Sequence, residues 1–550
     1  MEKYHFQQLN YQKQKPFSSF LSGISGLKGI PLWAFYVNRG QLIASFGVKN
    51  KNGQIMEFFP ANAAYHYVSK IGFRTFIKIN NETYECFKEE NDHQTLDVYQ
   101  DKVSISEHIE KFDITVKVTY FTLPNERLAS LNRKVEIINH NKENIDVEIV
   151  DGLTQILPTG IDFGGYKAVS NLLQSWMESK NTKDYVFYTL RGSTGDEAEV
   201  SEITEGHFIH TISSVDNTYI YDYKALFGED TSLNAPYHFI DGSLKTQKQT
   251  HVNQVPCAFS YQTYKGLKTE EPVQFVSMFG YVEHEEKLNS LVKKTSLIYV
   301  NDKELENQKL HEDITSVVET KTNFPIYDAY IKQSYMDNVL RGGYPLQLKV
   351  KDGFASYYVY SRKHGDLERD YNFFNLEPAY YSQGNGNFRD VLQNRRNDLL
   401  FFPEIKAFNI KMFASFIQDD GYNPLSIEGV TFTYLDQTDT YPREIQNLLK
   451  QPYTPGTLLM ALEDHGLEQA FNRILEKSKV NFQASFGEGY WEDHFTYLLD
   501  LIENFETVYP DQMSDLLFNE YVGFYQSNAY VVPRDEKYVL TKKQTVRQFG

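Results

Sequence analysis

The fold of the first half is decided by Phe112-Asp113-Ile114-Thr115-Val116-Lys117-Val118-Thr119-Tyr120. Apolar and polar residues alternate in this stretch, so a β-strand would place its apolar side chains on one face and its polar ones on the other. One buried and one solvated face are typical of an antiparallel sheet. Similar β-prone runs recur at 185–189, 208–212 and 273–279. Many short strands without long helices between them predict a large β-sandwich.

Two further strand-like runs frame a polar stretch. Val135-Glu136-Ile137-Ile138 and Ile145-Asp146-Val147-Glu148-Ile149 flank Asn139-His140-Asn141-Lys142-Glu143-Asn144, which is rich in turn-forming residues. The pattern predicts two strands joined by a turn.

Beyond about residue 325 the spacing becomes that of α-helices. Steps of three and four residues place the apolar side chains of two stretches on single helix faces. They are Phe401, Ile405, Phe408, Met412 and Phe416 in the first, and Trp491, His494, Leu498, Leu501 and Phe505 in the second. A helix over 327–340, ended by Arg341-Gly342-Gly343-Tyr344-Pro345, is expected to connect the halves. The predicted organisation is a β-sandwich domain over 1–320, a helical linker over 321–345 and a helical region over 346–550.

Composition limits the partners. The 550 residues include 55 Lys+Arg and 73 Asp+Glu, a formal net charge of −18. Nucleic-acid binding relies on Lys and Arg that neutralise phosphates, so this balance argues against such a partner. Aromatic residues make up 15% of the chain. They suit stacking on sugars, although a large β core needs them as well.

The cysteines and the apolar stretches indicate the compartment. Two cysteines, Cys86 and Cys257, leave no disulfide framework and no Cys-rich metal site. The sequence starts without an apolar signal segment, and no stretch reaches the roughly 18 apolar residues that span a bilayer. We therefore expect a cytoplasmic protein that contacts neither membrane nor nucleic acid.

One candidate binding segment runs from Ser361 to Asp398. It repeats Arg beside Asp, at Arg369-Asp370 and Arg389-Asp390. Sugar hydroxyls are both donors and acceptors, so guanidinium donors beside carboxylate acceptors suit them. The run Gly384-Asn385-Gly386 tolerates unusual backbone angles and favours a ligand-binding loop. The alternative is an ion-pair network at a domain junction.

A second candidate is Gly487-Glu488-Gly489-Tyr490-Trp491-Glu492-Asp493-His494-Phe495. A carboxyl group held beside an aromatic ring loses water, which favours the protonated form that a general acid needs. Asp493 is the best candidate for this role, with Glu492 and Glu488 as rivals. The alternative is an Asp in a first helical turn, where the helix dipole favours the charged carboxylate.

Three motifs follow one another in a characteristic order. They are Asp151-Gly152-Leu153-Thr154-Gln155-Ile156-Leu157-Pro158, Gly386-Asn387-Phe388-Arg389-Asp390-Val391-Leu392-Gln393-Asn394 and Trp491-Glu492-Asp493. They are similar to a sandwich segment, the sugar-binding segment and the acid-bearing Trp-x-Asp of cellobiose phosphorylase-like enzymes. The chain thus resembles glycoside hydrolase family 94 and the related long β-1,3-glucan and oligoglucan phosphorylases.

The resemblance implies a β-sandwich, a linker helix and an (α/α)6 toroid, of which the region 346–550 is an incomplete part. Two departures stand out. Asn394 replaces an Asp that is usual in the disaccharide-specific enzymes. The sequence also ends at Gly550, whereas relatives continue with the rest of the toroid and a β domain, where their phosphate-binding residues lie. We therefore expect either one half of a split enzyme or a truncated product.

The activity implied by the resemblance is inverting phosphorolysis of β-linked glucosides or oligoglucans, or the reverse synthesis. Inorganic phosphate is the co-substrate and α-glucose 1-phosphate the product. Asp493 would be the general acid, and Trp491 would shape its pocket. The other implied substrate-binding residues are Arg389, Asp390, Gln393, Arg362, Lys363 and Asp366. No metal and no organic cofactor is implied.

Two other functions stay open. A glycoside hydrolase of the same toroid fold would form reducing sugar without phosphate. A catalytically incomplete carbohydrate-binding or assembly subunit would bind glucan and act only with a second polypeptide. An incomplete toroid should also expose apolar helix faces, which predicts a homo-oligomer or a companion chain that carries the C-terminal half.

Overall fold

The computed structural model describes residues 5–192, 203–363, 374–436, 440–487 and 491–548. The chain forms two compact units, each with its own packing. The first is Met1–Met336 with Gly365–Ser382, and the second is Asp337–His364 with Gln383–Gly550. Helix α7 (Pro325–Gly342) runs through the boundary, in the segment expected to connect the halves, and Gly343 follows it at φ 93°.

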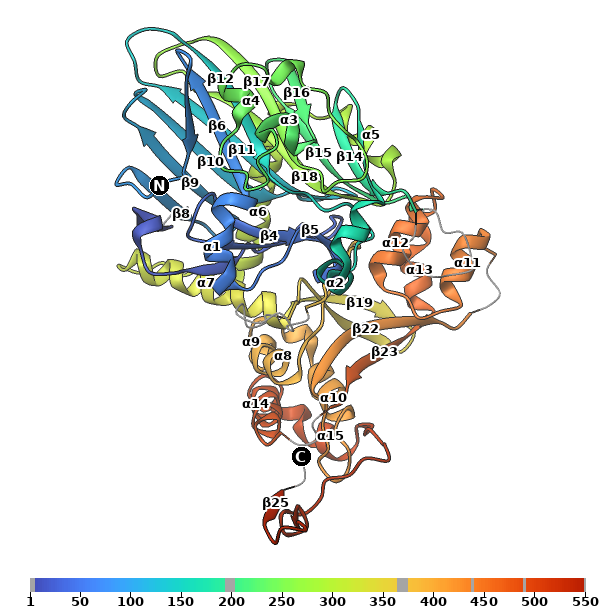
Figure 1. The fold of residues 1–550 in the computed structure, drawn as a ribbon. Helices are drawn as coiled ribbons and strands as arrows, with labels where there is room; N and C mark the ends of the chain where they lie inside the picture. Colours follow the sequence, from blue (N-terminus) through green and yellow to red (C-terminus); the bar gives the residue numbers. More distant parts are fainter. Residues whose placement is uncertain (1–4, 193–202, 364–373, 437–439, 488–490, 549–550) are drawn as a thin grey trace. The chain divides into compact units, whose positions relative to one another are not determined.

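The first unit is built on two antiparallel sheets, whose strands run from blue to green in Figure 1. Among the described residues, the larger sheet has nine strands in the order β1-β8-β9-β10-β11-β18-β15-β14-β13, and the smaller has five in the order β16-β17-β12-β6-β7. The larger sheet comprises β1 (Phe6–Leu9), β8 (Gln94–Val98), β9 (Lys102–Ile109), β10 (Ile114–Thr122), β11 (Ala129–Asn139), β13 (Met177–Asn181), β14 (Tyr185–Leu190), β15 (Gly206–Ile212) and β18 (Val273–Val282). The smaller comprises β6 (Phe73–Ile79), β7 (Glu82–Cys86), β12 (Ile145–Leu153), β16 (Asn217–Ile220) and β17 (Ala258–Leu267).

Strand β10 confirms the alternation that predicted a strand here. Ile114, Val116 and Val118 are buried, whereas Lys117 between them is exposed. The register places Val118 opposite Val135 of β11, so the buried face continues across the sheet.

The two sheets pack face to face. Phe73 of β6 meets Phe279 of β18 edge-on, with ring centroids 4.9 Å apart. Arg133 of β11 reaches across to Asp151 of β12, with Nη2 2.6 Å from Oδ1 and both side chains fully buried. Rings and a paired charge from opposite sheets therefore share one core, as in a β-sandwich.

The polar stretch after β11 does not close a hairpin. Strand β11 pairs with β10 and β18, whereas β12 pairs with β6 and β17. The two predicted strands exist, but the chain crosses from one sheet to the other between them. Alternation sets which face of a strand is buried and leaves open which strand lies beside it.

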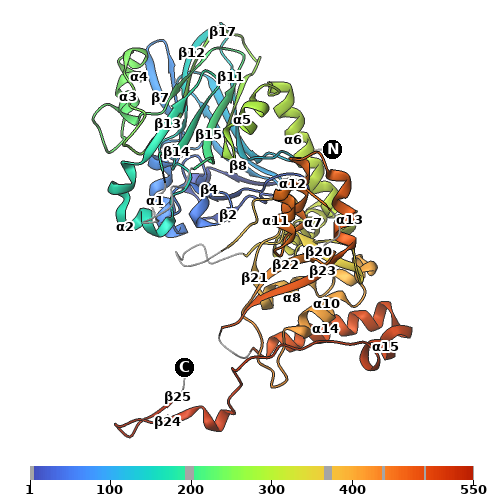
Figure 2. The same ribbon diagram turned by 90° about the vertical axis from the view of Figure 1, so that its right-hand side faces the viewer.

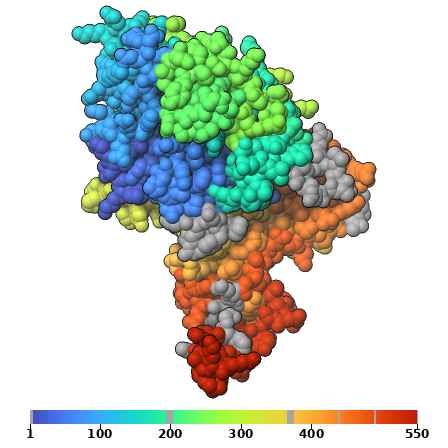
Figure 3. Space-filling model, in the orientation of Figure 1, coloured from blue at the N-terminus to red at the C-terminus, as the bar shows by residue number. Residues whose placement is uncertain are grey.

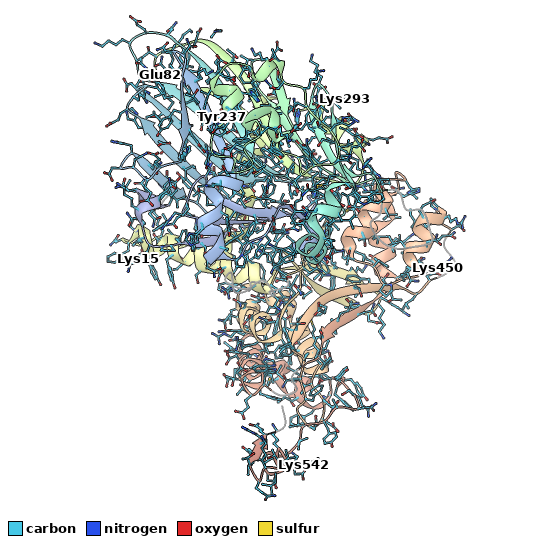
Figure 4. All side chains as sticks on the ribbon, in the orientation of Figure 1. Lys15, Glu82, Tyr237, Lys293, Lys450 and Lys542 are labelled. Carbon is cyan, nitrogen blue, oxygen red and sulfur yellow. The ribbon has the colours of Figure 1, made fainter. Side chains whose placement is uncertain are left out.

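Helices cover both outer faces of the sandwich (Figure 2). On the five-stranded sheet, α3 (Tyr223–Phe227) and α4 (Tyr237–Ile240) share a hydrophobic cluster with β6, β12 and β17. On the nine-stranded sheet, α5 (Glu285–Val292) and α6 (Leu297–Thr315) do the same with β14, β15 and β18. The segment of α3 and α4 forms the green surface of Figure 3, and Tyr237, labelled in Figure 4, is 51% exposed there.

A smaller four-stranded sheet completes the first unit. Its strands are β2 (Ser18–Phe20), β3 (Trp33–Val37), β4 (Ile43–Gly47) and β5 (Gln54–Met56). Helix α1 (Ala61–Ile71) packs on this sheet through Ala64 and Val68, against a core that includes Trp33. Helix α2 (Phe163–Gln174) follows β12.

The second unit combines small sheets with helices. Its strands are β19 (Tyr344–Val350), β20 (Gly353–Val359), β21 (Gly386–Asn387), β22 (Ser426–Tyr434), β23 (Ser478–Ser485), β24 (Tyr538–Leu540) and β25 (Val546–Gln548). Its helices are α8 (Phe388–Arg395), α9 (Asp398–Phe401), α10 (Phe408–Ser415), α11 (Arg443–Leu449), α12 (Pro455–Glu463), α13 (Phe471–Glu476), α14 (Asp493–Val508) and α15 (Met513–Phe518). Helix α14 packs against α8, α9 and α10, while α12 packs against α11 and α13. The predicted order of β-sandwich, connecting helix and helical region is confirmed, and a ring of six helix pairs stays a prediction.

One helix prediction in this unit was wrong. The stretch 401–416 is divided between the end of α9, a 3₁₀ turn at Pro403–Ile405 and α10. Pro403 has no N–H to donate within a helix, and Lys406 lies at φ 49°, outside the helical region. The second stretch does form one helix, α14, which buries His494, Leu501 and Phe505.

Candidate functional site

Three of the predicted sugar-binding residues lie on a helix. Arg389, Asp390 and Gln393 belong to α8, so the prediction of a loop was wrong at this point. The helix follows Asn387, whose backbone is extended, and its apolar side chains Phe388, Val391 and Leu392 are buried at helical spacing. Arg389 and Gln393 lie on the exposed side, with Asp390 in the first turn.

Side chains at the start of α8 hold the Asp390 carboxylate in place. Asn387 donates from Nδ2 to Asp390 Oδ2 at 2.9 Å, and Arg389 donates from Nε to Asp390 Oδ1 at 3.4 Å. Asn394 donates from Nδ2 to the backbone carbonyl of Asp390 at 2.6 Å. The side-chain amide of Asn394 is therefore hydrogen-bonded within its own helix.

Asp493, the predicted general acid, lies close to the start of α8 in space. Asp493 is the first residue of α14, and its Oδ2 lies 3.9 Å from Nη1 of Arg389. The Asp493 side chain is 42% exposed and that of Arg389 is 50% exposed. The carboxyl group thus stands in a first helical turn and in contact with solvent. Figure 1 shows α8 and α14 beside each other, as their packing requires.

Aromatic rings pack together beside Asp493, at the start of α14. Phe388 packs on His494 with ring centroids 4.6 Å apart, and Trp491 lies 6.3 Å from His494 with its plane rotated by 25°. Asn423 Nδ2 donates to the backbone carbonyl of Trp491 at 3.4 Å. The rival Glu492 is exposed, and the rival Glu488 lies outside the described residues.

The remaining predicted residues are placed differently. Arg362 is 5% exposed, its backbone N–H donates to the Leu340 carbonyl at 2.9 Å, and burial lowers the pKa of its guanidinium to about 10. Lys363 is partly exposed, and Asp366 lies outside the described residues. The structure therefore brings Arg389, Asp390, Asp493 and Trp491 to one place and holds Arg362 in the interior of the second unit.

A partly buried acid that the sequence reasoning missed, Asp398, lies at the start of α9, with its Oδ2 atom buried. Burial raises the pKa of Asp398 to about 7, although the Arg395 charge and a hydrogen bond with Tyr358 act in the opposite direction. The guanidinium of Arg395 stacks 3.6 Å from the centre of the Tyr358 ring, and Asn409 donates to the Tyr358 hydroxyl at 2.6 Å. The sequence places Arg395 and Asp398 three residues apart, a spacing that can indicate an ion pair. It gives no indication that the carboxyl group is removed from water.

Other chemistries find little support in the described ranges. They contain no cluster of three or more His, Cys, Asp and Glu side chains arranged to hold a metal ion. Cys86 and Cys257 are buried free thiols, and burial raises the pKa of both. No helix in the described part combines the length and apolar character that crossing a bilayer requires.

Comparison with known proteins returned structural likenesses alone. No family model and no curated protein sequence matched the chain. A bacterial glucoamylase complexed with acarbose aligns over 77% of this chain and 54% of its own, at 11% identity and a TM-score of 0.37. An inverting mannosidase of family GH92 from Bacteroides thetaiotaomicron aligns over 72% and 43%, at 10% identity and 0.30. A GalM/aldose epimerase homologue from C. elegans aligns over 49% and 100%, at 10% identity and 0.27.

The chain spans about half the length of that glucoamylase. All three TM-scores lie below 0.5.

Proposed function

We propose that this chain supplies the sugar site and the general acid of an inverting phosphorylase that acts on β-linked glucosides or oligoglucans. The observation that carries the proposal is the meeting of Arg389 and Asp493, 3.9 Å apart and both about half exposed. A forked donor and a carboxyl group open to solvent can engage a sugar, because neither is consumed by a closed structural ion pair.

In the proposed reaction Asp493 gives its proton to the glycosidic oxygen as the bond to the anomeric carbon breaks. A phosphate oxygen attacks that carbon from the opposite face, and the product is α-glucose 1-phosphate. The carboxylate then takes a proton back from solvent. A sugar lying over Trp491 would exclude water from Asp493 and favour its protonated form.

Asp390 fits a binding role better than that of a second acid–base group. Its two carboxylate oxygens accept from Asn387 and Arg389, which leaves it placed to accept from sugar hydroxyls. An inverting hydrolase needs a second carboxylate to activate water, whereas phosphate is itself the nucleophile. We include Gln393, Arg362, Lys363 and Asp366 in the proposed binding set on the resemblance alone.

We also propose that the second unit associates with another copy or with a companion chain. Its exposed aromatic side chains include Phe518 at 80%, Tyr521 at 94% and Tyr530 at 72%. Exposed apolar surface of this kind favours association. A cytoplasmic location belongs to the same proposal, since a charged sugar phosphate does not cross membranes. Sedimentation at micromolar concentration tests the association, and a monomer would contradict it.

The decisive experiment incubates the whole chain with β-linked oligoglucans, with and without phosphate. Consumption of phosphate with formation of α-glucose 1-phosphate is expected, and Asp493→Asn should abolish it while oligosaccharide binding survives. Glu492→Gln, the neighbouring exposed carboxyl, is the matched control and should retain activity.

Other outcomes separate the alternatives. Reducing sugar formed in phosphate-free buffer would identify a hydrolase. Glucan binding without turnover until a second polypeptide is added would identify an incomplete subunit. Unchanged phosphate consumption in Asp493→Asn would overturn the assignment of the acid.

A further inference from the structure

Three rings form a cluster where α8 and α14 begin. The imidazole of His494 lies 4.6 Å from the Phe388 ring, with planes 31° apart, and 6.3 Å from the Trp491 ring. Phe388 also meets Phe413 of α10 edge-on, at 5.3 Å. Phe388 is fully buried and His494 is 2% exposed, so the cluster belongs to the interior of the second unit.

Two of the three rings adjoin a residue of the proposed site. Phe388 immediately precedes Arg389, and His494 immediately follows Asp493. The contact between the Phe388 and His494 rings therefore joins the two segments that carry the guanidinium and the carboxyl group. The exposed Arg389–Asp493 pair cannot impose this geometry itself, because ion pairs of this exposure contribute about 0–1 kcal/mol.

Other contacts between the two helices lie farther along them. Arg396 Nη1 is 3.1 Å from Asp500 Oδ2, and Asn504 Nδ2 donates to the Arg396 carbonyl at 2.7 Å. These contacts join the end of α8 to the middle of α14, whereas the Phe388–His494 contact joins the first turns of the two helices.

The imidazole suits a place beside an acid because it stays uncharged. Burial lowers the pKa of His494 to about 4; the charges of Asp493 and Asp390 act in the opposite direction, and that of Arg389 in the same one. A cation at this position would add to the charge of Arg389 and favour the ionised form of a neighbouring carboxyl group. The neutral ring supplies packing area without that effect.

We infer that His494 is a positioning residue, whose ring, packed on Phe388, sets the acid Asp493 against the sugar-binding Arg389. The inference rests on the proposed function for its kinetic consequence. Its structural consequence, that the Arg389–Asp493 geometry depends on this ring, does not.

The test compares His494→Ala, His494→Phe and Leu501→Ala. Leu501 is a buried residue of the same helix, two turns away from the site, and serves as the control for lost packing. We expect His494→Ala to lower kcat by about 100-fold with little change in KM, since misplacing a catalytic group by about 1 Å has effects of that size. His494→Phe keeps an uncharged ring of similar shape and should retain most of kcat. Leu501→Ala should lower the melting temperature and leave kcat nearly unchanged.

Two results would overturn the inference. One is a kcat as low in His494→Phe as in His494→Ala, which would show that stacking is not what matters. The other is a crystal structure of His494→Ala in which Arg389 and Asp493 keep their separation. Should His494→Ala not fold, His494→Leu fills the volume without a ring and replaces it. If the wild-type chain has neither phosphorolysis nor hydrolysis, alone or with a second polypeptide, the proposed function fails, and the crystal structure alone decides on positioning.

Discussion

Two arginine–aspartate pairs of this molecule have opposite surroundings. In the first unit, Arg133 and Asp151 are both fully buried between the sheets, 2.6 Å apart. In the second, Arg389 and Asp493 are about half exposed and 3.9 Å apart. The same two side-chain types therefore serve a closed core in one region and remain available to a ligand in the other.

The buried pair is surrounded by groups that complete its hydrogen bonds. Arg133 also donates to Thr75 and to the hydroxyl of Tyr120, and Thr75 donates to Asp151 at 2.7 Å. A charged side chain inside a sandwich needs such hydrogen bonds, because removing a charge from water without them costs much free energy. The exposed pair needs no such shell because water solvates it.

The largest effect should come from breaking the buried pair. Asp151→Asn leaves the Arg133 charge uncompensated in the core, and we expect a loss of about 3–5 kcal/mol in the free energy of unfolding. Urea unfolding followed by circular dichroism measures it. The double variant Arg133→Met/Asp151→Leu removes both charges and should recover most of the loss. A loss below about 1 kcal/mol for Asp151→Asn would remove the contrast between the regions.

An intermediate effect should appear at Asp398, a partly buried acid of the second unit. Its pKa of about 7 in the folded protein exceeds the ordinary value of 3.8, so between these values the folded chain holds a proton that the unfolded chain releases. The free energy of unfolding should therefore fall as pH rises from about 4 to 7, by at most about 1.4 kcal/mol per pH unit, and level off above.

Asp398→Asn cannot titrate, and its profile should be flatter over that range. Unfolding at pH 5 and at pH 7.5 measures the difference. Asn397→Ala, a change at the adjacent neutral residue, should keep the wild-type slope. Equal slopes in Asp398→Asn and the wild type would contradict the assigned burial effect.

The smallest effect on stability should come from the exposed pair. Arg389→Ala should change the free energy of unfolding by less than about 1 kcal/mol, because both groups regain water, while oligosaccharide affinity falls. Arg396→Ala breaks a comparable exposed pair with Asp500 on the same helices. It should match Arg389→Ala in stability without a loss of affinity. Equal affinities for the two variants would contradict a sugar-binding role for Arg389.

Most residues of the candidate site could be predicted from the sequence, but their secondary structure and burial could not. Arg389, Asp390, Trp491 and Asp493 were selected by residue type and motif, and they do converge. The sequence reasoning placed the first two in a loop because the glycines and charges of 361–398 outweighed the buried spacing of Phe388, Val391 and Leu392. Arg362 was predicted to bind substrate on the resemblance, and only packing shows that it lies in the interior.

The alternation around Val116 and the spacing along α14 were determined by the sequence itself, because the period of apolar residues reports which face of an element is buried. The tertiary structure decided the rest. It determined that β11 and β12 join different sheets, that the Oδ2 atom of Asp398 is buried, and that Phe388 meets His494 across more than a hundred residues. Those outcomes depend on contacts between residues distant in sequence, and the pattern of one segment carries no record of its partner.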